Sequence, residues 1–431
     1  MRDFSFRLQN VKFIGMGSYL LLVILVCLSA TFAYVNHRYI KMPFVIGLFF
    51  LSTILSLIVL SSKLWDGQYY AEIKEVIEHT DISRIILEIM LGFLLFSGSL
   101  HTQWREIRSR LKPISLLAFG GVIASTLLIA GLLYLVCRIL DTPIGFIYCL
   151  IFGALISPTD PVSVLGILTR AGVPKKIEST IVGESLFNDG VGVVVFITFL
   201  KILRSGFDHF SFSQFGILFL REAAGGVFFG LLLGYILYRL LKSIDNYETE
   251  VLLTIAFVMG GYALCSYFDL SGALAMVIMG MFVGNYRQNL AMSDTTLEYV
   301  HKFWELIDVI LNAILFIGIA FVLVVIDLHP KFLLFGLSAF IIVLLSRTAI
   351  VLIPRFLFPK ILDITFRESR LLIWGGLRGG LSIALVLSLP DSNAKQLLMI
   401  ITYICVLFSI LLQGLTIEKM AKGLSNLKES P

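Results

Sequence analysis

Six polar side chains in two consecutive apolar stretches have the types and spacing of an ion-binding site. They are Thr159, Asp160, Glu184, Ser185, Asn188 and Asp189. Within the second stretch the separations are three and four residues, so these side chains share one face of a helix. Carboxylate, hydroxyl and amide oxygens are hard donors, and they suit a small alkali cation. We therefore predict a monovalent-cation site here.

Two prolines predict how this site is built. Pro158 and Pro161 bracket Thr159 and Asp160. Each proline lacks an N–H group, and its ring crowds the carbonyl four residues earlier, so the helix should break here. The residue before a proline is driven towards an extended conformation. In hydrocarbon, a broken helix is tolerated only where the freed polar groups meet protein partners or line a cavity. Asp160 should therefore present a carboxylate from an unwound crossover at mid-membrane.

The composition predicts an integral membrane protein. Hydrophobic residues make up 58% of the 431 residues and charged residues 15%, and the mean hydropathy is +0.93. Such values exclude an ordinary soluble protein. We expect an all-α membrane protein with about thirteen transmembrane helices. Their approximate ranges are 18–36, 42–61, 82–100, 113–137, 143–169, 178–200, 214–238, 249–267, 271–286, 303–326, 331–354, 368–390 and 395–416.

The charged loops predict the orientation. Lys and Arg concentrate in alternate loops and at the C-terminus, so we expect a cytoplasmic C-terminus and, with an odd number of spans, an N-terminus outside. The net charge of +5 follows from this bias and does not indicate nucleic acid as a partner. Membrane lipid is the expected partner. We expect no cofactor and no enzymatic activity, because no histidine or lysine base lies within the two polar stretches to activate Ser185.

A second interrupted span suggests an inverted repeat. If the span at 214–238 is a linker, six spans precede it and six follow in opposite orientation, and 143–169 corresponds to 368–390. The latter contains the run Trp374-Gly-Gly-Leu-Arg-Gly-Gly-Leu-Ser382. Paired interrupted segments of this kind indicate a transporter's midplane site. We therefore predict two inverted six-helix repeats with two crossed, broken helices.

Three segments resemble the signature segments of bacterial NhaP-type sodium/proton antiporters, and more distantly of eukaryotic sodium/hydrogen exchangers. They read Ser157-Pro-Thr-Asp-Pro-Val-Ser163, Gly183-Glu-Ser-Leu-Phe-Asn-Asp189 and Gly376-Leu-Arg-Gly-Gly380. The resemblance implies a homodimer in the bacterial cytoplasmic membrane that exchanges Na⁺ or Li⁺ for H⁺. It also implies one transport domain, 1–431, with core helices at about 113–203 and 331–416 and scaffold or dimerisation helices at about 18–100 and 214–326.

The same resemblance implies roles for individual residues. Asp189 would be the main cation and proton carrier, and Asp160, Ser185 and the Thr159 carbonyl would lie near the ion. Na⁺ would therefore be bound at Asp189, Ser185 and Thr159. Glu184 would pair with Arg378.

A count of the deep charges supports exchange independently. Asp160, Glu184 and Asp189 give three negative charges, whereas Arg347 and Arg378 give two positive ones. One uncompensated charge at the bilayer centre costs about 2.5–3.5 kcal/mol. Either a proton or a monovalent cation removes it, which predicts competitive, electroneutral one-for-one exchange by alternating access.

Several alternatives stay open at this stage. A potassium/proton antiporter of the same fold has the same motifs, and a cation channel is a more distant alternative because it would need repeated weak sites along a pore. Asp160 could serve only as the N-cap of the second half-helix. Asn188 could serve packing through hydrogen bonds to the broken span. Arg347 could anchor carbonyls at a helix end or act directly at the site.

Overall fold

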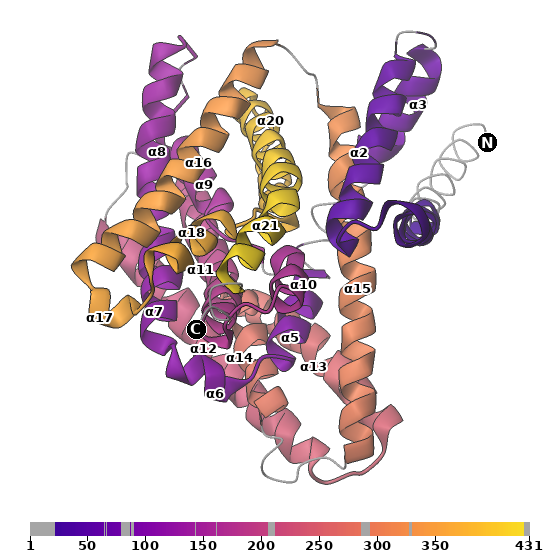
Figure 1. The fold of residues 1–431 in the computed structure, drawn as a ribbon, viewed down its shortest axis with the longest axis vertical. Helices are drawn as coiled ribbons and strands as arrows, with labels where there is room; N and C mark the ends of the chain where they lie inside the picture. The colour runs from indigo at the N-terminus through magenta and orange to yellow at the C-terminus, as the bar shows by residue number, and fades with distance from the viewer. Residues whose placement is uncertain are drawn as a thin grey trace, which may run out of the picture. The chain divides into compact units, whose positions relative to one another are not determined.

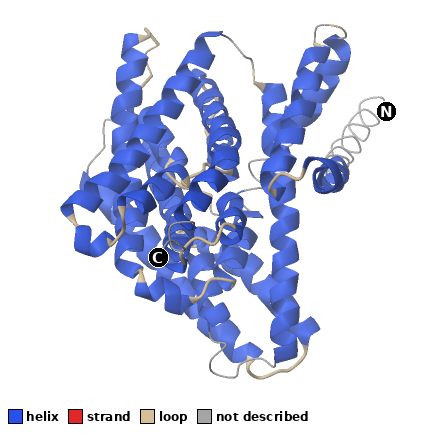
Figure 2. Ribbon diagram, in the orientation of Figure 1, coloured by secondary structure: helices blue, strands red, loops and turns tan. Residues whose placement is uncertain are grey.

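The computed structural model describes most of the chain. The described residues are 22–63, 65, 67–78, 87, 90–142, 144–160, 162–205, 212–285, 294–326 and 330–425. Among them the secondary structure is entirely helical, joined by loops (Figure 2). Pro161, one of the two prolines expected to break a helix, lies outside the described residues.

Figure 1 labels most of the helices, which follow one another along the chain in the order given below. Three of them, marked η, are π-helical turns. The elements are η1 (Asn36–Ile40), α2 (Phe44–Ser62), α3 (Gly67–Glu78), α5 (Leu91–Leu100), α6 (Trp104–Ser109), α7 (Leu111–Ser115), η3 (Leu116–Gly120), α8 (Gly121–Ile139), α9 (Phe146–Ile156), α10 (Val162–Arg170), α11 (Lys175–Ser205), α12 (Phe212–Leu241), α13 (Tyr247–Tyr267), α14 (Gly272–Asn285), α15 (Asp294–Val325), α16 (Pro330–Leu357), α17 (Pro359–Leu362), α18 (Phe366–Trp374), α19 (Gly380–Leu387), α20 (Asn393–Phe408), η6 (Ser409–Gln413) and α21 (Gly414–Ser425).

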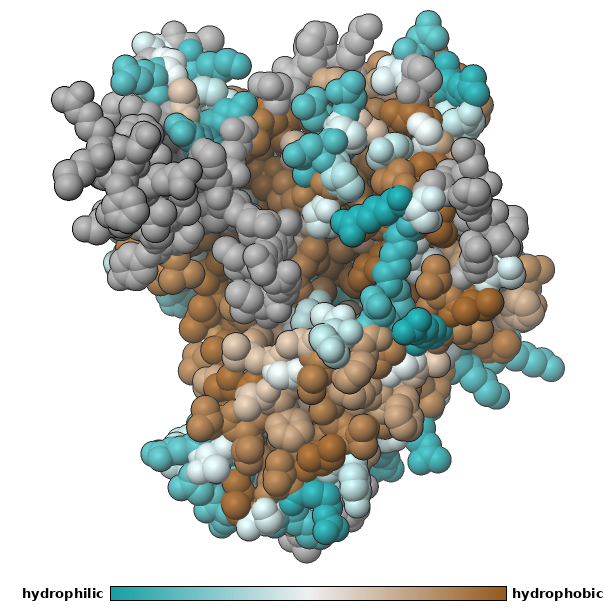
Figure 3. All heavy atoms as spheres, turned by 180° about the vertical axis from the view of Figure 1, so that it is seen from behind, coloured by the Kyte–Doolittle hydropathy of each residue, from teal (hydrophilic) through white to brown (hydrophobic). Residues whose placement is uncertain are grey.

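Each of the thirteen predicted spans contains a described helix, although parts of four spans, 18–21, 82–86, 88, 89, 143, 161 and 286, lie outside the described residues. In the described part of the chain, nine helices are long and apolar enough to cross a membrane, beginning with Leu22–Ile40. Three shorter apolar helices, α5, α9 and α14, lie at the third, fifth and ninth predicted spans. The interrupted pair α18 and α19 lies at the twelfth. On the face shown in Figure 3, hydrophobic residues cover a broad area, and hydrophilic residues gather both above and below it. The predicted all-α membrane fold is confirmed.

Both predicted helix interruptions are present. The first break separates α9, which ends at Ile156, from α10, which begins at Val162. The second break separates α18, which ends at Trp374, from α19, which begins at Gly380. The two breaks meet, because the Asp160 N–H donates to the Leu377 carbonyl at 2.8 Å. Extended backbone from two distant spans therefore pairs inside the protein.

The chain forms two compact units. The first comprises Met1–Ile82 and Ile310–Asp327, and the second comprises Ser83–Val309 and Leu328–Pro431. In the first unit the Tyr70 hydroxyl donates to the Val324 carbonyl at 2.9 Å. Both residues belong to a buried apolar cluster whose other members are Leu25, Ile317 and Phe321. All the candidate site residues lie in the second unit.

Close packing of α8 against α9 positions the first break. The two helices touch at Gly153, where an added Cβ would lie 3.0 Å from both the Cα and the carbonyl carbon of Thr126 and closer still to its oxygen. These are backbone atoms of α8, so they cannot rotate away as a side chain would. Only glycine permits this approach.

Replacement of Gly153 should therefore destabilise the protein. We expect Gly153→Ala to cost about 1–3 kcal/mol through overpacking, measured as a lower apparent Tm in detergent. Gly131→Ala on α8 is the matched control, because nothing lies within 4 Å of its added Cβ. An unchanged Tm for Gly153→Ala would contradict the described packing.

Candidate functional site

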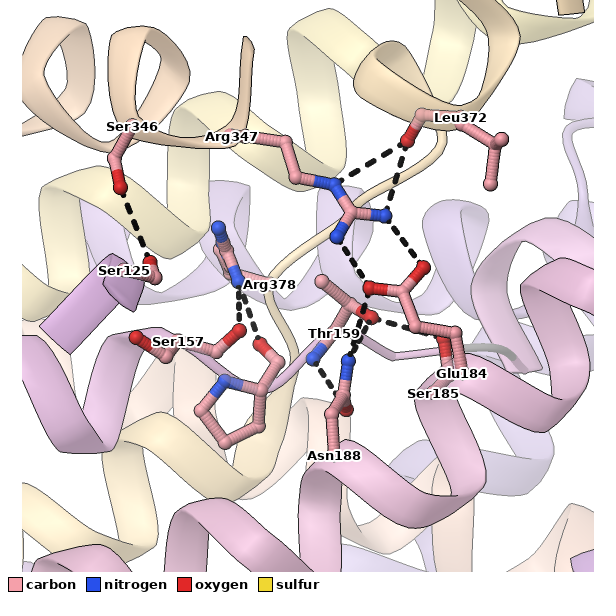
Figure 4. Close-up of polar contacts among 11 residues, drawn as sticks. Ser125, Ser157, Thr159, Glu184, Ser185, Asn188, Ser346, Arg347, Leu372 and Arg378 are labelled. Carbon is pink, nitrogen blue, oxygen red and sulfur yellow. Dashed lines mark hydrogen bonds and ion pairs between the residues drawn. The ribbon is translucent and has the colours of Figure 1, made fainter. Parts of the chain in front are cut away.

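Three buried side chains join the first break to α11. The Asn188 side chain accepts from the Thr159 N–H at 3.2 Å and donates to the Thr159 hydroxyl at 2.8 Å. The Thr159 hydroxyl also shares a hydrogen bond of 2.9 Å with the Ser185 hydroxyl (Figure 4). Asn188 therefore satisfies a backbone group that the helix break leaves without a helical partner. Its predicted packing role, through hydrogen bonds to the broken span, is confirmed.

A buried ion pair lies one turn away on α11. Arg347, on α16, donates from one terminal nitrogen to Glu184 Oε1 and from the other to Oε2 at 2.7 Å. The two residues are 7% and 1% exposed. This two-point contact fixes the guanidinium relative to the carboxylate. Arg347 also donates to the Leu372 carbonyl near the end of α18, at 3.1 and 3.3 Å. It thus both anchors a helix end and neutralises Glu184.

The expected pairing of Glu184 with Arg378 is wrong. Arg378 instead donates to the carbonyls of Ser157 and Pro158, the latter at 2.9 Å (Figure 4). The physical reason is that the first break frees these carbonyls at the negative end of the α9 dipole, where a cation is favoured. Arg378 lies in the second break and is adjacent to them, whereas Arg347 projects from a continuous helix onto Glu184.

The second break also leaves room for Asp160. An added Cβ on Gly379 would lie 2.7 Å from Asp160 Cβ and 2.9 Å from one of its carboxylate oxygens. A side chain at this position would therefore displace the carboxylate. Asp160 is partly exposed, and its N–H is held by the Leu377 carbonyl.

Asp189 lies outside this hydrogen-bonded network. It follows Asn188 on α11 and lies one turn beyond Ser185. Its side chain is partly exposed, and within the described residues no hydrogen bond or ion pair engages its carboxylate. Asp160 is near enough to interact with it electrostatically. The assignment of Na⁺ to Asp189, Ser185 and Thr159 stays a prediction.

Two backbone groups of the site were not predicted from the sequence. They are the carbonyls of Leu372, which binds Arg347, and Leu377, which binds the Asp160 N–H. The signal was present in the paired glycines around Arg378, because an interrupted helix leaves carbonyls without their partners. The spacing does not reveal which donors reach them.

Comparison with known proteins finds the same family over nearly the whole chain. Residues 24–423 match the family model described as the transmembrane sodium/hydrogen exchanger. The chain is 44% identical over 402 residues to the Na⁺/H⁺ antiporter NhaP of Pseudomonas aeruginosa, covering 92% of this chain and 95% of that protein. It is 35% identical over 364 residues to the Na⁺/H⁺ antiporter NhaH of Halobacillus dabanensis, covering 83% and 86% respectively.

A solved structure has a similar fold. The sodium proton antiporter MjNhaP1 of Methanocaldococcus jannaschii superposes with a TM-score of 0.75 at 21% sequence identity, covering 95% of this chain and 99% of that one. At this level of identity the likeness concerns the fold.

The ion pair predicts a specific pattern of stability. Glu184→Ala and Arg347→Ala should each cost about 3–5 kcal/mol, because each leaves the partner's charge buried and unpaired. The double variant should cost much less than the sum. Thermal unfolding of the two singles and the double measures this coupling. The control cycle pairs Glu184→Ala with Arg378→Ala, and a larger coupling there would overturn the corrected assignment.

Proposed function

The chain belongs to the sodium/hydrogen exchanger family, and we propose that it is a secondary active antiporter that exchanges Na⁺ or Li⁺ for H⁺ across a membrane. The family is one of transporters, and its multiple apolar helices make the chain a multi-pass membrane protein. The named relatives in Pseudomonas and Halobacillus are sodium/proton antiporters. This supports sodium as the cation.

One observation carries the proposal: a carboxylate without an ionic partner lies beside an ordered set of oxygen donors. Asp189 is partly exposed, whereas the neighbouring Thr159, Ser185 and Asn188 are buried and bonded to one another. A cation at Asp189 would meet hard oxygen ligands already in place, with Asp160 and the Thr159 carbonyl nearby. A proton would neutralise the same carboxylate, so the two compete.

The charge distribution favours electroneutral exchange. Glu184 is neutralised by Arg347, and Arg378 supplies one positive charge against Asp160 and Asp189 together. The site is left with one net negative charge, and one bound Na⁺ or one proton cancels it. The empty, charged form is costly to carry through a low-dielectric region. Loaded forms therefore move readily and the empty form does not, which couples the two fluxes.

A cavity offers the cation a route towards this site. It has a volume of about 530 Å³ and is lined by parts of α5, α6, α10, α11 and α15. On α11 its lining residues Glu178, Val182 and Leu186 recur every four residues, and Asp189, three residues further, continues the same helical face. Carboxylates in a cleft raise the local cation concentration. The acidic residues that line the cavity are Glu106, Glu178, Glu305 and Asp308.

The proposal extends to assembly and location. The core helices at about 113–203 and 331–416 would move against scaffold helices at about 18–100 and 214–326, and the scaffold would form a homodimer. The protein would lie in the bacterial cytoplasmic membrane with its C-terminus in the cytoplasm and its N-terminus outside, in contact with lipid. Its cellular role would be sodium and pH homeostasis. No cofactor would be needed, because the transported ions complete the site.

The carrier role of Asp189 can be tested in proteoliposomes. We expect proton flux on addition of Na⁺ or Li⁺ and weak flux with K⁺. We expect no flux for Asp189→Asn, because its neutral amide can neither balance the charge of a cation nor bind a proton. Asp391→Asn is the matched control: Asp391 is fully exposed and pairs only with the nearby Lys395 at 2.9 Å, so exchange should persist. Wild-type flux in Asp189→Asn would refute the assignment, and flux with K⁺ alone would change the substrate.

The stoichiometry predicts insensitivity to voltage. A net charge moved per cycle would couple transport to the membrane potential by about 2.3 kcal/mol per 100 mV, or about 50-fold in the equilibrium ion gradient. We expect instead that an imposed potassium-diffusion potential leaves the final sodium gradient unchanged and that no net current flows. A gradient that follows the applied voltage would exclude one-for-one exchange.

A further inference from the structure

The second break removes one identifiable helix hydrogen bond. In a continuous helix the Arg378 N–H would bond to the Trp374 carbonyl four residues earlier. The last bond of this kind in α18 is from the Gly375 N–H to the Leu371 carbonyl, at 2.8 Å. Beyond it, residues 376–379 are not helical, and α19 begins at Gly380. The Arg378 N–H and the Trp374 carbonyl must find other partners.

Two side chains of η6 take over both ends of this missing bond. The Ser409 hydroxyl accepts from the Arg378 N–H at 2.9 Å, and the Gln413 amide donates to the Trp374 carbonyl at 3.4 Å. The Ser409 hydroxyl in turn donates to the Gln413 side-chain oxygen at 2.7 Å. The chain of contacts is therefore Arg378 N–H, Ser409, Gln413, Trp374 carbonyl. It replaces one backbone hydrogen bond by three.

Ser409 and Gln413 make these contacts from buried positions in a π-helical turn. Ser409 and Gln413 are both buried, so water cannot substitute for either of them. They are four residues apart in a π-helical turn, a geometry that often marks functional positions within longer helices. A side chain inserted into a helix ladder is also a recognised cause of a sharp kink.

We propose that Ser409 and Gln413 are positioning residues that hold the second break open at the ion site. If the Arg378 N–H and the Trp374 carbonyl bonded to each other, the segment would rewind into the helix. The Arg378 guanidinium would then leave the Ser157 and Pro158 carbonyls. The Leu377 carbonyl would also leave the Asp160 N–H. The two residues thus act on the cation through the backbone of both breaks, without touching it.

The test measures cation affinity separately from turnover, and it rests on the proposed sodium/proton exchange. Ser409→Ala and Gln413→Met should each raise the KM for Na⁺ about tenfold, because a buried donor or acceptor loses its partner and the break shifts. The maximal rate should change less. Ser409→Thr keeps the hydroxyl and should restore the wild-type KM. The double variant should be no worse than the poorer single, because both residues serve one relay.

A matched control distinguishes the effect of losing a hydroxyl at the second break from the effect of losing any buried hydroxyl. Ser52→Ala on α2 removes a fully buried hydroxyl that bonds only to the Leu48 carbonyl of its own helix, at 2.8 Å, and should leave the KM unchanged. Sodium-dependent thermal stabilisation in detergent provides a second readout that needs no transport. The sodium concentration for half-maximal stabilisation should rise by the same factor in Ser409→Ala.

The outcomes are distinguishable. An unchanged KM and unchanged sodium stabilisation in folded Ser409→Ala or Gln413→Met would overturn the positioning role, while wild-type exchange would leave the proposed function intact. Loss of folded protein in both variants, with Ser409→Thr normal, would show a purely structural role and would also overturn it. Absence of cation-dependent exchange in the wild type would refute the proposed function itself.

Discussion

The structure depends on one constraint: backbone groups freed by a helix break in a low-dielectric region must find partners within the protein. An unmet buried donor or acceptor costs about 1–3 kcal/mol. The two breaks satisfy this requirement largely through each other, since Asp160 and Leu377 pair through their backbones and Arg378 binds the carbonyls at the end of α9. The site is therefore a property of two spans more than two hundred residues apart in sequence, and of the helices that hold them together.

Some charges of the candidate site are held by ion pairs and hydrogen bonds, whereas no such contact engages the Asp189 carboxylate within the described residues. Arg347 donates hydrogen bonds to Glu184 and to the Leu372 carbonyl. Arg378 donates to the carbonyls of Ser157 and Pro158 in the first break. Ser346, next to Arg347, further ties α16 to Ser125 of α8 at 3.2 Å (Figure 4). Within the described part of the chain, the Asp189 carboxylate is held by no comparable hydrogen bond or ion pair. An antiporter needs this division, because a carboxylate already held by an arginine would have to break a buried ion pair before it could exchange a cation for a proton.

Much of this arrangement follows from local sequence, and the rest depends on contacts between helices. Pro158 and the glycines around Arg378 predict where the helices break, because proline and glycine disfavour a helical backbone at their own positions. The spacing of Ser185 and Asn188 places both on one face of α11 for the same reason. The partner of Glu184 could not be obtained in this way, since either arginine balances its charge and only packing decides which one reaches it. The role proposed for Ser409 and Gln413 could not be predicted from the sequence either, because their spacing does not show which backbone groups their side chains reach.

The hydrogen bonds of the candidate site also bear on how the proposed core would move. They join the first break to α11, α11 to α16, α16 to α18, and the second break to η6. Apart from the last two residues of α11 and the first residue of α16, these segments lie within the ranges proposed for the core, 113–203 and 331–416. A displacement of the core would therefore leave the oxygen donors in their relative positions and change only the side from which Asp189 is reached. Under the proposed mechanism, binding geometry and access would then be controlled by different contacts, and a cation would keep the same ligands throughout the motion.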